Sequence, residues 1–274
     1  FLRSRKIHIY VIMISVFLTS CGESQSTEKK LNIESEEPYE YLQADEIIII
    51  DKSIWENGSL EEVNKALSEV TDINHRYDNG MTPLSLAAFR NTTEVVIEII
   101  KHGAYIDLQS DNGMTPLMFA AINNQFEVAS VLINAGAKVN HRSVNNMTPI
   151  FYSTFNEDYD VARILLEAKA DLTMRADDGQ TPFHYLVRSN NNAKLISLFL
   201  TYGAVLNETT NRGNWSPLML ASFSNCKDVI IELVNMGADL SVKSSDGKTA
   251  FDILNLRIDL DYNTKAELLS LLRR

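Results

Sequence analysis

The sequence predicts an all-α solenoid, in which short pairs of antiparallel helices stack side by side and are joined by turns and hairpin loops. The first observation is a repeated phrase, because residues 78–84 (DNGMTPL) recur 33 residues later as residues 111–117. The second is that each copy runs on into an alanine pair, an apolar helical pattern and a Gly-Ala pair. A fixed period of this length means that small units stack to bury a shared core.

Each unit opens its first helix with a capping residue, which is usually followed by a proline. The hydroxyl of Thr or Ser accepts hydrogen bonds from the free N–H groups of the first helical turn. Proline is tolerated at the next position because an N–H there would have no partner within the helix, and its φ is already set for a helix. The capping residues are Thr82, Thr115, Thr148, Thr181, Ser216 and Thr249, at spacings of 33, 33, 33, 35 and 33.

Asparagine and glycine mark the ends of the helices. Asn tolerates the left-handed conformation by which the chain leaves a first helix. Such residues stand nine positions after the cap, at Asn91, Asn124, Asn190 and Asn225. Glycines that favour a helix C-cap follow the second helices, at Gly103, Gly136, Gly203 and Gly237. Lys169 takes this place in the third copy, and we expect it to cost some stability.

These motifs resemble the ankyrin repeat, because the turn, Thr-Pro-Leu, the alanine pair, the apolar helix and Gly-Ala-x-x-Asn occur in register. The resemblance implies about five good repeats between residues 72 and 240, flanked by two degenerate capping repeats. One ankyrin-repeat domain is therefore expected over residues 46–274, with units at about 46–76, 77–109, 110–142, 143–175, 176–210, 211–243 and 244–274. Extra residues near 189–192 and 211–214 are either drift or a partner-specific lip.

The N-terminus predicts an export signal rather than a folded element. Three basic residues precede an apolar run over residues 7–18, which is too short to span a bilayer as a helix. Leu18-Thr19-Ser20-Cys21 then resembles the lipobox of bacterial lipoproteins, which implies a signal peptide over residues 1–20 and a lipid on Cys21. Gly22, by the habit of that family, implies delivery to the outer membrane, facing the periplasm. Plain secretion and an uncleaved interfacial anchor are the alternatives.

The composition of residues 21–45 predicts a disordered acidic tether. Glu, Ser, Gln and Lys dominate this segment, so it cannot bury enough apolar surface to order itself. The alternative is that its C-terminal end belongs to the fold. Because the sequence begins at Phe1 rather than Met, we expect the true start to lie upstream.

No pattern of catalytic or metal-binding residues stands out. The formal net charge of -11 argues against a nucleic-acid partner, because phosphate contacts need Lys and Arg. The histidines lack a second ligand at helical spacing and no cysteine cluster exists, so we expect no metal, no cofactor and no enzyme. The resemblance implies that His184 bonds neighbouring turns, and Cys226 is expected to be a small, partly buried hydrophobe.

Two series of equivalent residues are candidates for a partner-binding surface, since both should face the concave side of an ankyrin-like stack. We name the residues just before each cap the turn ladder: Met81, Met114, Met147, Gln180 and Trp215. The helix ladder stands seven residues after each cap: Phe89, Ile122, Phe155, Arg188 and Phe223. Met and aromatic side chains are common interface anchors. For the helix ladder, the alternative is half-buried packing between the first helices.

The sequence therefore predicts a membrane-tethered, monomeric module that binds another protein of the envelope or a secreted protein. An immunity or inhibitor lipoprotein against a secreted toxin and a scaffold for an envelope enzyme are both open within this class. A purely structural spacer is a further alternative, and no residue pattern supports an enzyme.

Overall fold

The computed structural model describes residues 48–90, 92–156, 159–189, 193–257 and 261–273. The predicted signal peptide, its lipobox with Cys21 and the predicted tether lie outside the described residues, as do Asn91 and Asn190. The described part belongs to one compact unit, residues 46–274. Within it, no helix is both long enough and apolar enough to cross a bilayer.

The described residues form seven pairs of α-helices and a short turn, η1 (Asp78–Gly80). The first helices of the pairs are α2 (Lys52–Asn57), α4 (Pro83–Arg90), α6 (Pro116–Ile122), α8 (Pro149–Ser153), α10 (Pro182–Ser189), α12 (Pro217–Ser224) and α14 (Ala250–Asn255). The second helices are α3 (Leu60–Glu69), α5 (Thr93–Lys101), α7 (Phe126–Asn134), α9 (Asp160–Glu167), α11 (Ala193–Thr201), α13 (Lys227–Asn235) and α15 (Tyr262–Leu271).

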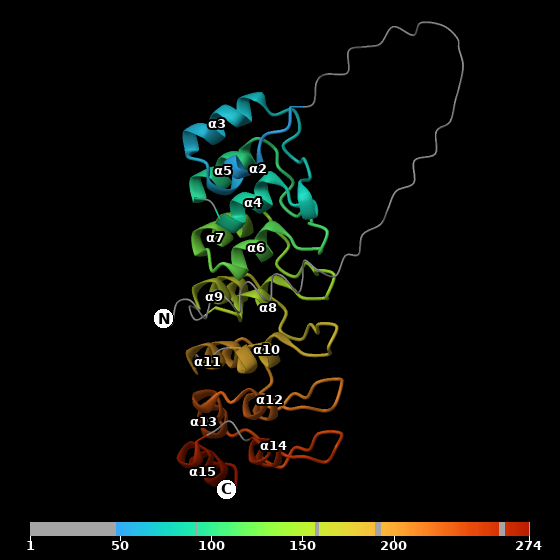
Figure 1. Cartoon of the computed structure of the whole chain (residues 1–274), viewed down its shortest axis with the longest axis vertical. Helices are drawn as coiled ribbons and strands as arrows, with labels where there is room; N and C mark the ends of the chain where they lie inside the picture. The colour runs from blue at the N-terminus through green and yellow to red at the C-terminus, as the bar shows by residue number, and fades with distance from the viewer. Residues whose placement is uncertain (1–47, 91, 157–158, 190–192, 258–260, 274) are drawn as a thin grey trace, which may run out of the picture. The chain divides into compact units, whose positions relative to one another are not determined.

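The pairs stack in chain order, and the predicted all-α solenoid is confirmed. Figure 1 shows the first helices in one column, the second helices in a column beside it, and the hairpin loops projecting on the side away from the second helices. α4 packs against α2, α5 and α6, while α5 packs against α3 and α7. Small residues permit this close stacking, since Ala87 and Ala88 of α4 are fully buried.

Most first helices begin as the capping residues predict. The Thr115 hydroxyl accepts from the N–H of Met118, Ser216 from that of Met219, and Thr249 from that of Asp252. Proline follows Thr115 and Ser216, where its missing N–H has no helical partner in any case. These caps place the turn ladder and the helix ladder at fixed distances from each helix start.

Thr148 is the exception, and the prediction that it caps α8 is wrong. Its hydroxyl makes no cap bond and is buried without a hydrogen-bond partner. α8 is also cut short at Ser153. The Ser153 hydroxyl donates to the carbonyl of Ile150 at 2.8 Å, and the Thr154 hydroxyl to that of Phe151 at 2.7 Å. Such side-chain bonds compete with the helical ladder, which explains the early end. The two preceding units carry alanine pairs at these positions, Ala87-Ala88 and Ala120-Ala121.

The helix ends adopt the left-handed backbone that their residues predict. Asn124 and Asn225 leave their first helices at φ 53° and 57°. The four predicted capping glycines all have positive φ, and so does Lys169, at 65°. Lys169 therefore adopts a left-handed conformation, which lowers the stability of the fold because the side chain has a Cβ.

Adjacent hairpins are joined by main-chain hydrogen bonds at five junctions of the described stack. The first runs from the N–H of Asp111 to the carbonyl of Asn79 at 2.9 Å, and the last from Ser245 to Gly213 at 2.8 Å. The other three join Val144 to Asn112, Asp177 to Asn145 and Asn211 to Gly179. The hairpin edge is therefore continuous, which holds the turn ladder in a row.

Candidate protein-binding site

The turn ladder lies along the hairpin edge but exposes little surface in the middle of the stack. Met147 is only 4% exposed, and Gln180 is also buried. Met81, Met114 and Trp215 are half-buried and pack against the core. Only the partly exposed members can offer apolar area to a partner.

The helix ladder changes character along the stack. Phe89, Ile122 and Phe155 are half-buried. The Phe89 ring packs edge-on against Phe119 with centroids 5.9 Å apart, and Phe155 packs against Tyr185 at 6.2 Å. In this half of the ladder, the geometry matches the alternative of packing between first helices.

Towards the C-terminal end, the same ladder position faces solvent. Arg188 is exposed, and Phe223 is 50% exposed. The series continues into the last unit, where Leu256 is 64% exposed and Lys248 extends the turn ladder. Sequence reasoning missed these two residues, although they stand at the same offsets from the cap Thr249.

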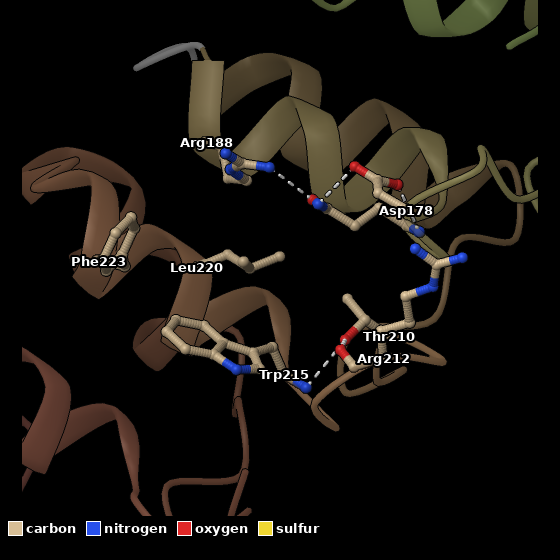
Figure 2. Close-up of a pocket in the computed structure, with 8 residues that line it drawn as sticks. Asp178, Arg188, Thr210, Arg212, Trp215, Leu220 and Phe223 are labelled. Atoms are coloured by element: carbon tan, nitrogen blue, oxygen red, sulfur yellow. Dashed lines mark hydrogen bonds between the residues drawn. The ribbon is translucent and has the colours of Figure 1, made fainter. Parts of the chain in front are cut away.

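A hollow of about 310 Å³ lies between α10 and α12, where the two ladders meet. In Figure 2, Asp178 and Arg188 lie on one side of it and Trp215, Leu220 and Phe223 on the other. Four of the ten predicted binding residues line it together with four that were not predicted: Gln180, Arg188, Trp215 and Phe223 with Asp178, Thr210, Arg212 and Leu220. Arg212 lies in the segment 211–214 that carries extra residues.

The apolar wall of the hollow is an aromatic pair. The rings of Trp215 and Phe223 meet edge to face, with centroids 5.6 Å apart and an interplanar angle of 88°. The hairpin fixes Trp215, because its N–H donates to the Thr210 hydroxyl at 3.1 Å and its carbonyl accepts from the Thr210 N–H at 3.0 Å. Gly213 leaves room for the indole, since a Cβ there would lie 2.9 Å from Cδ1 of Trp215.

The opposite wall is polar and internally bonded. The Asp178 carboxylate accepts from the main-chain N–H of Gln180 at 3.0 Å, from its side-chain amide at 2.8 Å and from the Tyr185 hydroxyl at 2.9 Å. Burial and the neighbouring Asp178 carboxylate raise the pKa of Tyr185, so this hydroxyl stays a donor at neutral pH. Nη1 of Arg188 donates to Oε1 of Gln180 at 3.0 Å, which leaves the guanidinium charge unneutralised.

His184 bonds neighbouring turns beside the hollow, as the resemblance implied. Its Nδ1 lies 2.7 Å from the Thr181 hydroxyl, and its Nε2 lies 2.8 Å from the carbonyl of Glu208 in the next hairpin. Because the ring is fully buried, desolvation lowers the pKa of His184 to about 4. The neutral ring therefore bridges the cap of α10 to the hairpin loop that carries Thr210, Arg212 and Trp215.

The described residues contain no group of His, Cys, Asp and Glu able to hold a metal ion. Cys226 is buried as expected, and desolvation raises the pKa of its thiol, which disfavours the reactive thiolate. Within the described part, the hollow can therefore bind another molecule through its shape, its apolar side chains and its charged side chains.

The comparisons with known proteins agree with this architecture. The family model for ankyrin repeats matches residues 53–143 and 150–244. The rat and mouse ankyrin repeat and SAM domain-containing protein 6 are 33% and 31% identical over 67 residues, which are 24% of this chain and 8% of each relative. The matched stretch is thus a small part of those longer proteins.

Two solved structures share the fold. The human ASB11 ankyrin repeat domain superposes with a TM-score of 0.70 at 20% identity, covering 80% of this chain and 96% of that one. The ankyrin repeat domain of Bcl-3, described as a unique member of the IkappaB protein family, gives 0.66 at 21% identity and covers 81% and 97%. Ankyrin domains are general protein-interaction modules and are typically not catalytic. With the family model matching more than half of its length, the chain belongs to the ankyrin-repeat family.

Proposed function

We propose that this chain binds a partner protein through the edge of its ankyrin array that the hairpins and the first helices form, with the hollow between α10 and α12 as the centre of the contact. The observation that carries the proposal is the aromatic pair of the half-buried Trp215 and the exposed Phe223, placed beside two arginines. Aromatic and arginine side chains in a concavity are the usual anchors of protein interfaces. The residues 211–214 then act as the partner-specific lip.

We further propose that a lipid on Cys21 tethers the array to the bacterial outer membrane, facing the periplasm. The support is the lipobox pattern and the acidic, weakly apolar segment that follows it. The test is mass spectrometry of the membrane-extracted protein, which should show a lipid mass on an N-terminal peptide that begins at Cys21. A Cys21→Ser variant should leave the membrane fraction, and an unmodified cysteine in membrane-bound protein would refute the tether.

The binding function is tested by crosslinking and pull-down from whole envelopes with the full chain as bait. A specific partner should be captured by the parent protein and lost with a Trp215→Ser/Phe223→Ser double variant. The matched control is Tyr105→Ser/Tyr262→Ser, which removes two exposed aromatic side chains far from the hollow in sequence. Equal loss of the partner in both variants, or no captured protein at all, would contradict the proposal.

The identity of the captured protein would separate the two finer roles. A secreted toxin whose activity falls on binding would make the chain an immunity or inhibitor lipoprotein. An envelope enzyme that keeps its activity in the complex would make it a scaffold.

A further inference from the structure

The hollow between α10 and α12 also defines what kind of partner segment it accepts, and this inference rests on the proposed binding function. We propose that it receives an acidic segment of the partner that carries one large apolar side chain. The apolar group packs against Trp215 and Phe223, and the flanking carboxylates pair with Arg188 and Arg212.

The apolar contact follows from the aromatic wall. Phe223 is half exposed on one side of the hollow, and the buried Leu220 lines the same side. The volume of about 310 Å³ is at the small end for a ligand site, which suits a side chain rather than a whole small molecule. Burying a large apolar side chain against two rings removes its surface from water, which favours association.

The charge preference follows from two guanidinium groups without acidic partners. In the described part of the chain, neither Arg188 nor Arg212 forms an ion pair with a carboxylate. Arg175, which precedes the unit of Arg188, differs because it pairs with Glu208 and is bonded to two carbonyls. Its charge is therefore used within the fold, whereas the other two remain available to a carboxylate, which an arginine binds through two N–H groups.

The single carboxylate of the hollow, Asp178, offsets only part of this preference, because it faces two guanidinium groups. Asp178 accepts three hydrogen bonds from Gln180 and Tyr185, so its oxygens are already engaged. A lysine-rich segment would have to approach two arginines to reach the aromatic pair. The chain as a whole has a net charge of -11, but charges beyond about 10 Å are screened at physiological salt. The two nearby guanidinium groups therefore decide the sign of the preferred ligand.

The equivalent positions of earlier units lack this combination. The helix ladder carries Phe89, Ile122 and Phe155 there, and the turn ladder carries methionines. Arg90 does stack on Phe89, with its Cζ 5.3 Å from the ring centroid, but Arg90 is not itself a ladder residue. An arginine and a tryptophan at ladder positions occur together only at this hollow among the described units.

The test is a fluorescence titration of the full chain with a short synthetic peptide that carries one phenylalanine among glutamates. Trp215 reports binding directly, because the other tryptophan, Trp55, is fully buried in the first unit. The peptide should bind more tightly than the same peptide with lysines, or with alanine in place of phenylalanine. Arg188→Gln and Arg212→Gln should each weaken binding about fivefold, and this loss should shrink at high salt.

The matched control is Arg163→Gln on α9, where the guanidinium is already paired with Asp160 and Glu167, and it should leave the affinity unchanged. Equal affinity for the lysine peptide, no binding of the acidic peptide, or an affinity insensitive to both arginine variants would overturn the inference. A captured envelope partner that depends on Trp215 and Phe223 but not on the arginines would leave the proposed function standing while this inference fails.

Discussion

The helix ladder is packed into the protein in its N-terminal half and exposed to solvent in its C-terminal half, although the repeat position is the same. Near the N-terminus, an aromatic ring from the next first helix covers the ladder residue: Phe119 lies on Phe89, and Tyr185 on Phe155. Near the C-terminus the corresponding covering positions hold Leu220 and Ile253, which are smaller, and Phe223 stays half exposed. The repeat determines where a side chain lies, and its neighbours decide whether it becomes core or surface.

The largest difference expected between the halves is in their response to acid. Three residues after the cap, the unit with α10 has His184, where the two preceding units have Met118 and Phe151. The folded pKa of His184 is about 4, below the ordinary histidine value of 6.5. The stability contributed by the neutral ring is therefore present above pH 6.5 and is lost as the pH falls towards 4. The full loss is about 3 kcal/mol in the free energy of unfolding, most of it by pH 5.

Urea unfolding followed by circular dichroism at pH 7 and pH 5 measures this loss. Because the carboxylates also titrate, the quantity to compare is the change between the two pH values in the parent chain and in His184→Gln. The parent should lose about 2 kcal/mol more than the variant. The same loss in both proteins would show that His184 does not impose the acid sensitivity.

A second difference concerns packing. Phe155→Ala should lower the free energy of unfolding by about 2 kcal/mol, because it removes a half-buried ring from between first helices. Phe223→Ala should cost less than about 1 kcal/mol, since half of that side chain is already in water. Thermal and urea unfolding of the two variants check this. Similar losses would remove the distinction between a packed and an exposed half.

A third prediction sharpens the account of Trp215. Gly213→Ala should cost about 1 kcal/mol and shift the Trp215 emission, because its φ is 81° and the new Cβ would meet the indole. The control is Gly136→Ala, where φ is 94° but no atom lies within 4 Å of the new Cβ. That variant should show the backbone cost with an unchanged emission spectrum. An emission shift in both variants would mean that the contact is not local.

The smallest expected effect lies at Lys169. Replacing it by glycine should stabilise the chain by about 0.5–1 kcal/mol, because glycine adopts its φ of 65° without the penalty of a Cβ. The melting temperature is the measurement. Gly103→Lys in the packed N-terminal half should show the opposite change, and a neutral result for both would remove the glycine argument.

Most of the fold could be predicted because each unit repeats its own signals. Thr115, Gly136 and Asn124 each report a local backbone need, so they indicate structure without knowledge of tertiary contacts. The predicted cap at Thr148 was wrong, and a capping motif does not reveal the reason. The hydroxyls of Ser153 and Thr154 bond to backbone carbonyls and shorten α8.

The candidate site could be predicted only as a set of positions. The exposure of Phe223 depends on the size of the residue across from it, and the hollow depends on the hairpin that carries Arg212 and Gly213. These are contacts between units, which the period of the repeat does not encode. The covering residue four positions after the next cap is a signal that can be read in advance, since it is Phe or Tyr in the middle units and Leu or Ile later.

The most direct test of the central claim is hydrogen exchange of the full chain with and without its captured partner. The account predicts that protection concentrates in residues 178–188 and 210–223, with little change in residues 81–89. Protection over residues 81–89, or along the second helices alone, with the hollow unchanged would contradict the claim that the C-terminal half of the ladder is the binding surface.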